Sequence, residues 1–303
     1  RYKPHESMKI YVIGIGLIGG SMALELKELF RDCQVVGIDQ SEAHLEEALA
    51  LGIIDEKGSL ATLAEADRVI LSIPVKESLR LLPTLLDQLN DEALLWDVGS
   101  TKEQLCKGVE NHSKRDQYLA AHPIAGTEES GPESGFAELF DNRWCILSPS
   151  VKAKKEDIKK LQKFWELIGS KIKIMSFEEH DHILSLTSHL PHAIAYNIVK
   201  TAINNENKFK EDIIQYSAGG LRDFTRIAAS DPLMWRDIFI DNSENVLKFL
   251  ENFSNNLEEL KKAIKEKNAH KLIKIFSSTK NFRKEIIKAG QDVKSPDFGR
   301  KKN

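Results

Sequence analysis

A histidine in the middle of the chain has the residue type and surroundings that acid–base chemistry needs. The segment Ala121-His122-Pro-Ile-Ala-Gly126-Thr-Glu128 follows a short apolar run. A histidine at the end of a strand, followed by proline and glycine in a loop, is well placed to accept a proton near neutral pH. Taken alone, His122 is equally compatible with a purely structural role, so its function depends on what lies beside it.

A second histidine pair occurs in the segment Ser188-His189-Leu-Pro191-His192. The proline indicates a helix start or a kink, and two histidines three residues apart could bind an anion or a metal ion. The alternative for His189 is that it caps or packs against a helix. No acid or cysteine completes a closed ligand set within this segment, so we predict no metal site.

Two arginines that could grip an anion lie in the segment Gly219-Gly-Leu-Arg222-Asp-Phe-Thr-Arg226. They are four residues apart and would share one face of a helix, and arginine binds carboxylates through paired hydrogen bonds. Arg222 could instead form a surface pair with Asp223 or Glu211. The apolar and small neighbours of Arg226 indicate that it is partly buried. Trp235 follows in Asp231-Pro-Leu-Met-Trp235, where a core position is the simpler interpretation.

The glycine-rich segment Gly14-Ile-Gly16-Leu17-Ile18-Gly19 lies between a β-branched run and residues with helical apolar spacing. This is the context in which such a segment binds dinucleotides. Gly14 would form the tight turn, Gly16 would let the backbone approach a pyrophosphate, and Gly19 would let helix and strand pack closely. The pyrophosphate would then lie at the positive end of the helix dipole.

An acidic residue follows at the distance expected for binding an adenosine ribose. Asp39 ends a second apolar run and lies 20 residues after Gly19. A carboxylate at this position accepts a hydrogen bond from the ribose 2′-hydroxyl and repels a 2′-phosphate. No arginine follows it, since the next residues are Gln40 and Ser41. The sequence therefore predicts NAD, rather than NADP, as the cofactor.

Alternating strand and helix patterns must position these residues. Seven strands are predicted, over residues 9–13, 34–39, 67–74, 93–97, 117–121, 144–147 and 171–175. Helices are predicted after the glycine-rich segment and over residues 42–51, 79–89, 154–168, 180–203, 223–230, 232–253, 257–265 and 271–288. The pattern predicts an α/β fold, in which a Rossmann-type, doubly wound, mostly parallel sheet (8–178) precedes an all-helical C-terminal domain (179–290). Ser72, Ser100 and His122 follow predicted strands and should meet at one edge of the sheet, whereas His180 and His182 are interpreted as solvated.

Composition and charge exclude several classes of protein. The 303 residues include 43 Lys and Arg against 46 Asp and Glu, a net charge of −3, which argues against a protein that coats nucleic acid or anionic membranes. Three cysteines without a C-x-x-C motif disfavour a disulfide framework and favour the cytoplasm. No membrane-spanning run or signal peptide is expected. Residues 1–7 are expected to be a remnant before Met8, and 291–303 a flexible tail.

Taken together, these motifs resemble those of the prephenate dehydrogenase family, which includes arogenate and cyclohexadienyl dehydrogenases. The resemblance runs from about Met8 to Glu251. Its motifs are Gly14-x-Gly16-x-x-Gly19-Gly20-Ser21, Asp97-Val-Gly-Ser100-Thr-Lys102, His122-Pro-Ile-Ala-Gly-Thr-Glu128, Ser188-His-Leu-Pro-His192, and Asp223-Phe-Thr-Arg-Ile-Ala228 with Asp231-Pro-x-Met-Trp235. The glycine motif is shared by many dehydrogenases, whereas the later four together are specific to this family.

The resemblance implies NAD-dependent oxidative decarboxylation of prephenate to 4-hydroxyphenylpyruvate, on the route to tyrosine. His122 is similar to the catalytic histidine that binds the ring hydroxyl, and Ser100 to the serine beside that hydroxyl and the nicotinamide. Arg226 resembles the arginine that holds a substrate carboxylate. The other implied substrate-site residues are His192, the supporting His189 and Trp235, Glu128 at the pocket mouth, and Gly219, which the partner subunit would present.

Alternatives remain open at this point. The substrate could be arogenate, or both compounds, because no single residue decides between a side-chain ketone and an amine. An imine or hydroxyacid reductase would have the same two-domain plan but usually places a lysine on the helical domain, and a non-catalytic NAD-sensing protein would not need Ser100, His122 and Arg226 together. The apolar early helices predict a homodimer through the helical domain.

Overall fold

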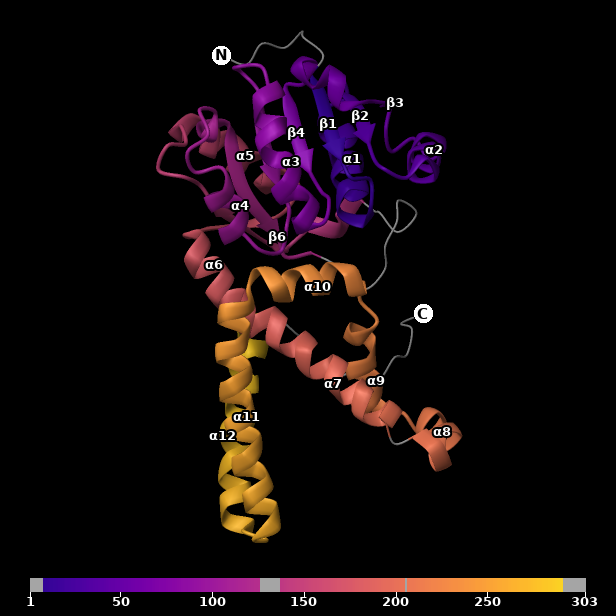
Figure 1. The fold of residues 1–303 in the computed structure, drawn as a ribbon, viewed down its shortest axis with the longest axis vertical. Helices are drawn as coiled ribbons and strands as arrows, with labels where there is room; N and C mark the ends of the chain where they lie inside the picture. Colours follow the sequence, from indigo (N-terminus) through magenta and orange to yellow (C-terminus); the bar gives the residue numbers. More distant parts are fainter. Residues whose placement is uncertain (1–7, 126–136, 205, 291–303) are drawn as a thin grey trace.

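A computed structural model describes residues 8–125, 137–204 and 206–290. The predicted leader (1–7) and tail (291–303) lie outside the described residues. Figure 1 shows a sheet flanked by helices, coloured indigo to magenta, above an extended set of helices coloured pink to yellow. One long helical hairpin projects away from the sheet.

Among the described residues, eight strands form one sheet in the spatial order β3-β2-β1-β4-β5-β6-β7-β8, and only the β6–β7 pair is antiparallel. The strands are β1 (Lys9–Ile13), β2 (Gln34–Ile38), β3 (Glu56–Lys57), β4 (Arg68–Leu71), β5 (Leu94–Asp97), β6 (Tyr118–Pro123), β7 (Trp144–Ser148) and β8 (Lys171–Ile174). The order reverses between β1 and β4, where the chain leaves β1 toward β2 and later returns to β4. In open α/β sheets, ligands bind at such a point, outside the carboxyl ends of the strands.

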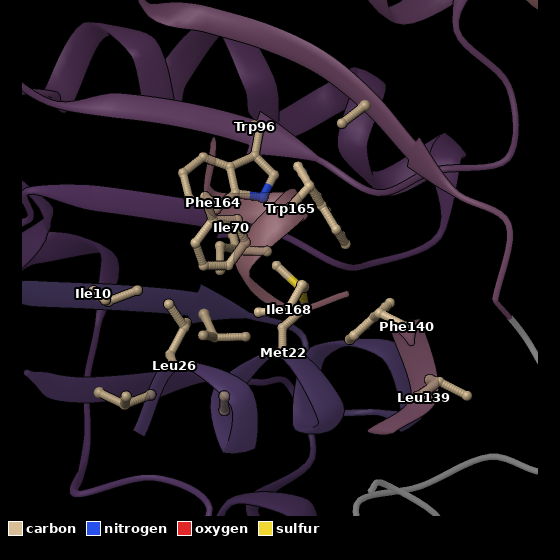
Figure 2. Close-up of a cluster of buried hydrophobic side chains, with 14 of the residues drawn as sticks. Ile10, Met22, Leu26, Ile70, Trp96, Leu139, Phe140, Phe164, Trp165 and Ile168 are labelled. Carbon is tan, nitrogen blue, oxygen red and sulfur yellow. The ribbon is translucent and has the colours of Figure 1, made fainter. Parts of the chain in front are cut away.

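Helices cover both faces of the sheet because its strands are apolar on both sides. Ile10 and Val12 of β1 belong to one buried cluster, and Tyr11 and Ile13 to a second on the opposite face. The helices of this part are α1 (Leu17–Leu29), α2 (Glu42–Ala50), α3 (Val75–Gln88), α4 (Glu103–Gly108) and α5 (Lys155–Leu167). Figure 2 shows the first cluster, in which side chains of α1 and α5 pack onto the strands around Trp96. The second cluster contains side chains of α3 and α4.

The chain after β8 is helical in the described residues. It contains α6 (Phe177–Leu184), a π-helical turn (Ser185–His189), α7 (Leu190–Asn204), α8 (Glu206–Gln215), α9 (Gly219–Ala228), α10 (Pro232–Asp241), α11 (Ser243–Lys265) and α12 (Ala269–Lys288). α6 packs against α4 and α10 packs against α3, so both join the helical part to the sheet (Figure 1). No helix among the described residues is long and apolar enough to cross a membrane.

The predicted fold class is confirmed, but several predicted helix boundaries are wrong. The predicted break between 253 and 257 is absent, because α11 runs without interruption from Ser243 to Lys265. The chain breaks instead at Asn242, whose buried side chain bonds to the helix carrying Asp181. α3 begins at Val75, four residues before its predicted start, and Pro83 lies inside the helix. β3, α4 and α8 are absent from the elements predicted from the sequence.

Candidate active site

A cleft of about 490 Å³ opens between the carboxyl ends of the sheet strands and the helical part of the chain. Its sheet side is formed by the residues that follow β1, β4 and β5 and by the end of β6. Its helical side is formed by α6, the π-helical turn, α7, α9 and α10. The cleft brings together these predicted site residues: Gly16, Leu17, Ile18, Ser72, Ser100, His122, His192, Arg226 and Trp235.

The glycine-rich turn is shaped by close packing at two positions and by open space at the third. Gly14 has a φ of +96°, and a Cβ atom there would lie 2.1 Å from the Ser72 carbonyl oxygen. A Cβ at Gly19 would lie 1.9 Å from the carbonyl oxygen of Gly14, so helix and turn touch. At Gly16 no atom lies within 4 Å of such a Cβ. The open position is the N-cap of α1, where backbone N–H groups have no side-chain cap and can bind a phosphate.

Asp39 holds this turn at the end of β2. Its Oδ2 accepts a hydrogen bond of 2.8 Å from the backbone N–H of Ile15, and its Oδ1 accepts one of 2.8 Å from Ser41. The carboxylate therefore lies beside the glycine-rich turn, as its spacing from Gly19 predicts. Carboxylate oxygens accept more than one hydrogen bond, so a ribose hydroxyl can still be bound.

A buried ion pair anchors the loop that carries Ser100. Lys102 is fully buried, and its ammonium group contacts Asp97 at the end of β5. Asp97 also accepts hydrogen bonds from the hydroxyl of Tyr118 (2.8 Å) and from the backbone N–H of Gly99 (3.0 Å). These contacts hold residues 97–102 in a turn between β5 and α4, with the paired Asp97 and Lys102 at its two ends. Ser100 lies within it, on the wall of the cleft.

His122 lies on β6 and is 8% exposed, with its Nδ1 2.7 Å from Nε2 of His180. Burial lowers the pKa of His122 well below its usual value, and His180, Lys102 and His189 lower it further. The imidazole is therefore neutral at physiological pH, which is the state that a proton acceptor needs.

The interpretation of His180 as a solvated residue is wrong. Its side chain is fully buried, and its Nδ1 lies 2.7 Å from Oδ1 of Asp181, whereas His182 is exposed as expected. A signal was present in the sequence, because His180, Leu184 and Ser188 lie at i, i+4 spacing on one helix face. Because the charged Glu178 and Glu179 precede His180, the apolar character of this face is weak in the sequence.

On the helical side, a π-helical turn precedes Pro191 and positions the predicted histidine pair. The turn agrees with the predicted kink, and proline has no backbone N–H to donate to the preceding turn. His192 stacks on the Trp235 ring, with centroids 3.6 Å apart and an angle of 17° between the planes. Burial lowers the pKa of His192, and the nearby charge of Arg226 lowers it further. The expected partial burial of Arg226 is wrong for the single chain, since its side chain is exposed at the cleft.

His189 lies behind Trp235, outside the lining of the cleft. It is 1% exposed, and its Nδ1 accepts a hydrogen bond of 3.2 Å from the Asn242 side chain. Within the described residues, neither Nε2 of His189 nor Nε1 of Trp235 has a hydrogen-bond partner. Buried donors without a partner are uncommon and often meet water or a ligand.

The structure does not bring every predicted residue to the cleft. Gly219 is the first residue of α9 and is not part of the lining. Glu128 lies outside the described residues. Arg222 is 3.8 Å from Asp223, the surface pair considered as its alternative. In the parts of the chain that the structure describes, no group of three or more His, Cys, Asp or Glu side chains is placed to hold a metal ion.

The buried histidines predict a loss of stability in mild acid. Burial lowers the pKa values of His122 and His180, and that of His189 to about 4. Below pH 6.5 the unfolded chain gains protons on these rings while the folded chain does not, so unfolding becomes easier as the pH falls. Between pH 6.5 and 5 we expect His189 alone to cost about 2 kcal/mol of unfolding free energy.

Urea unfolding of the chain at pH 7.5 and pH 5 measures this effect. His189→Gln should reduce the difference between the two pH values, whereas His182→Gln, at an exposed position of the same helical run, should leave it unchanged. Equal stability of the wild-type chain at the two pH values would contradict the prediction.

Two family models match the chain. One, described as the nucleotide-binding domain of prephenate dehydrogenase, matches residues 22–174, and the other, described as the prephenate dehydrogenase dimerization domain, matches residues 176–278. The boundary between the two matches lies where β8 ends and α6 begins.

Individual proteins are similar over nearly the whole chain. A cyclohexadienyl dehydrogenase of Zymomonas mobilis is 36% identical over 287 residues, which cover 94% of this chain and 98% of that protein. A prephenate dehydrogenase of Bacillus subtilis is 34% identical over a segment that covers 90% of this chain and 75% of that protein. The crystal structure of a prephenate dehydrogenase from Aquifex aeolicus in complex with hydroxyphenyl propionate and NAD+ superimposes with a TM-score of 0.84 at 36% identity, covering 94% of this chain and all of that one.

Proposed function

The chain belongs to the prephenate dehydrogenase family, an oxidoreductase family of tyrosine biosynthesis, and from this premise we propose that it oxidatively decarboxylates prephenate to 4-hydroxyphenylpyruvate. The observation that carries the proposal is the position of His122. Its neutral ring lies in the same cleft as the glycine-rich turn of the nucleotide-binding domain, so a proton acceptor and a dinucleotide site face one substrate. We also propose that the sheet domain spans residues 8–178 and the helical domain 179–290.

The cofactor is NAD, and the residues present fit it. The uncapped N-terminus of α1 and the open space at Gly16 would hold the pyrophosphate, and Asp39 would hold the adenosine ribose. Leu17, Ile18 and Ser72 line the cleft beyond the turn, toward His122. When bound, NAD supplies the acceptor for the hydride.

His122 and Ser100 would handle the ring hydroxyl of prephenate. Hydride departs from C4 while the hydroxyl proton moves to His122, so that a carbonyl forms at C4. The bond between C1 and the carboxylate then breaks, its electron pair makes the ring aromatic, and His122 returns the proton to the oxygen. Carbon dioxide and one hydride are the net losses, and Ser100 would orient the hydroxyl toward His122.

The helical side would bind the anionic end of the substrate. Prephenate carries two carboxylates, and Arg226 and His192 lie together at the cleft. His192 is held from both sides, because Trp235 stacks on its ring and its Nδ1 bonds the Ser188 carbonyl at 2.8 Å. We assign Arg226 and His192 to substrate binding, with His189 and Trp235 as their supports. Glu128 and Gly219 remain substrate-site proposals from the resemblance.

Arogenate is the second candidate substrate, because a cyclohexadienyl dehydrogenase is among the similar proteins. The two compounds differ by a side-chain ketone or amine. A purified chain incubated with NAD and prephenate should show reduced-cofactor absorbance at a rate well above the rate with NADP. Parallel assays with arogenate measure the preference between substrates, and absence of turnover with both would overturn the proposed function.

The exposed apolar side chains of the helical part support a homodimer. α11 and α12 form the projecting hairpin in Figure 1, and their exposed residues include Leu247 (64%), Ile273 (65%) and Phe282 (64%). α12 has no buried residue in the single chain. A surface of this kind on an isolated chain marks an interface. Sedimentation that finds only monomer at micromolar concentration would contradict the homodimer.

Gly16→Ala should weaken NAD binding without disturbing the fold. A Cβ at this position meets no protein atom within 4 Å but would stand where the pyrophosphate approaches the backbone. We expect the dissociation constant for NAD to rise at least about tenfold, or ~1.4 kcal/mol. Calorimetric titration measures the NAD affinity, and thermal unfolding measures whether the stability of the fold is unchanged. An unchanged NAD affinity would remove Gly16 from the cofactor site.

A further inference from the structure

A hydrogen-bonded chain of three buried side chains runs from the cleft into the interior. Nδ1 of His122 lies 2.7 Å from Nε2 of His180, and Nδ1 of His180 lies 2.7 Å from Oδ1 of Asp181. None of the three is more than 8% exposed. β6 carries His122 and α6 carries the other two, so these hydrogen bonds join the sheet to the helical domain.

Asp181 determines the direction of donation along these hydrogen bonds, because it can only accept. Both of its carboxylate oxygens accept backbone N–H groups at the start of α4, Oδ1 from Lys102 at 2.8 Å and Oδ2 from Glu103 at 3.0 Å. A carboxylate used in this way is an acceptor only, so Nδ1 of His180 must donate to it. A neutral imidazole carries one proton, and Nε2 of His180 is therefore an acceptor.

The same reasoning fixes the proton of His122. Since Nε2 of His180 accepts, Nδ1 of His122 must donate to it, and the lone pair of His122 lies on Nε2. His180 is neutral, as this order requires, because burial lowers its pKa. The ring of His122 lines the cleft, so Nε2 is the nitrogen left for a bound substrate.

Resting on the proposed function, we propose that His180 and Asp181 are positioning residues that hold His122 in the tautomer whose Nε2 accepts the substrate proton. When the substrate O–H bond breaks and the Nε2–H bond forms, the imidazolium of His122 keeps its Nδ1–H bond to His180. Asp181 keeps its charge and takes no proton. A carboxylate that orients a catalytic histidine in this way also occurs in the serine protease triad, one link shorter.

Other charged and titratable groups face His122 and His180, but none of those among the described residues takes over the positioning of His122. Lys102 faces both histidines from the β5–α4 turn, and its charge is paired with Asp97. His189 faces His122 from the π-helical turn, and its pKa is lowered to about 4. The Cys145 thiol of β7 hydrogen-bonds the backbone of His122, and burial raises its pKa.

The tautomer of His122 can be observed directly in the wild-type protein without substrate. Ring ¹⁵N NMR of histidine-labelled protein at pH 7.5 distinguishes a protonated Nδ1 from a protonated Nε2, and the His122→Asn spectrum assigns the signal. We expect a neutral ring with the proton on Nδ1. A wild-type ring with its proton on Nε2 would overturn the proposal, and this measurement needs no variant of His180 or Asp181 to fold.

Variants then separate positioning from mere connection of the two domains. His180→Leu removes the acceptor for Nδ1–H, so kcat should fall about 100-fold while KM changes less than threefold. His180→Gln can still accept through its amide oxygen and should recover at least a tenth of the wild-type kcat. In Asp181→Asn the amide donates as well as accepts, so we expect both His122 tautomers and a kcat lowered about tenfold. His182→Gln, at the exposed position that follows Asp181, should have the wild-type kcat and KM.

The outcomes are distinguishable from failure of the proposed function. If neither prephenate nor arogenate is turned over, the proposed function fails, while the ring spectrum of the wild type still decides the tautomer. If folded His180→Leu and Asp181→Asn retain the wild-type kcat and ring spectrum, the two residues only connect the domains and the inference is wrong.

Discussion

His122→Asn is expected to lower kcat for prephenate oxidation about 1,000-fold, the loss typical of removing a general base. The proton acceptor acts in the transition state and contributes little to ground-state binding, so KM should change less than about threefold. Asparagine suits the test because its amide N–H can replace Nδ1 as the donor to His180, which lies 2.7 Å away in the wild type. Steady-state kinetics with prephenate and saturating NAD measure both constants.

The pH profile gives the same prediction a second readout. Because burial lowers the pKa of His122, and the neighbouring His180 and Lys102 lower it further, the acid limb of kcat/KM in the wild type should lie below pH 6.5. Below its pKa the ring is protonated and cannot accept the hydroxyl proton, so the rate falls with falling pH. The residual activity of His122→Asn should lack this limb. A kcat within a few-fold of the wild type, with unchanged NAD affinity, would show that His122 is not the base.

The parts of the site that could be predicted from sequence are those that local backbone geometry or chain order determines. Gly14 is needed because the turn gives it a φ of +96°, and Gly19 is needed because a side chain there would overlap the carbonyl of Gly14 in the turn itself. Ser72, Ser100 and His122 share one cleft because parallel strands place their carboxyl ends at one edge. The glycine positions are determined within the motif, and the shared cleft follows from the alternation of strands and helices along the chain.

The parts that could not be predicted depend on contacts between distant segments. His180 meets a partner 58 residues earlier in the chain, and its immediate neighbours are charged. No proline or glycine marks the helix break at Asn242. The break coincides with hydrogen bonds from the Asn242 side chain to the Asp181 carbonyl and to His189, which are distant in sequence. Lys102 is fully buried, and besides its pairing with Asp97 its backbone N–H donates to Asp181, 79 residues later in the chain. Sequence spacing reports which face of a helix a residue lies on, but not what that face meets.

Arg226→Ala is expected to raise KM for prephenate about 10- to 50-fold and to change kcat less than about threefold. A charge-assisted contact from arginine to carboxylate contributes about 1.5–3 kcal/mol, and the exposure of Arg226 at the cleft favours the lower part of that range. Strong neutralisation of the departing carboxylate would stabilise the ground state and slow its loss. An arginine that only fixes the position of the anion therefore affects binding more than turnover.

Arg222→Ala is the matched control, because Arg222 lies one turn earlier on α9, pairs with Asp223 and does not line the cleft. Its KM should equal that of the wild type. Arg226→Lys keeps the charge but not the paired geometry, so its KM should fall between the other two. Removing Arg226 should also raise the pKa of His192, which its charge now lowers, and ring NMR can follow that change. A loss confined to kcat would mean that Arg226 acts on the reacting bonds and not on the position of the substrate.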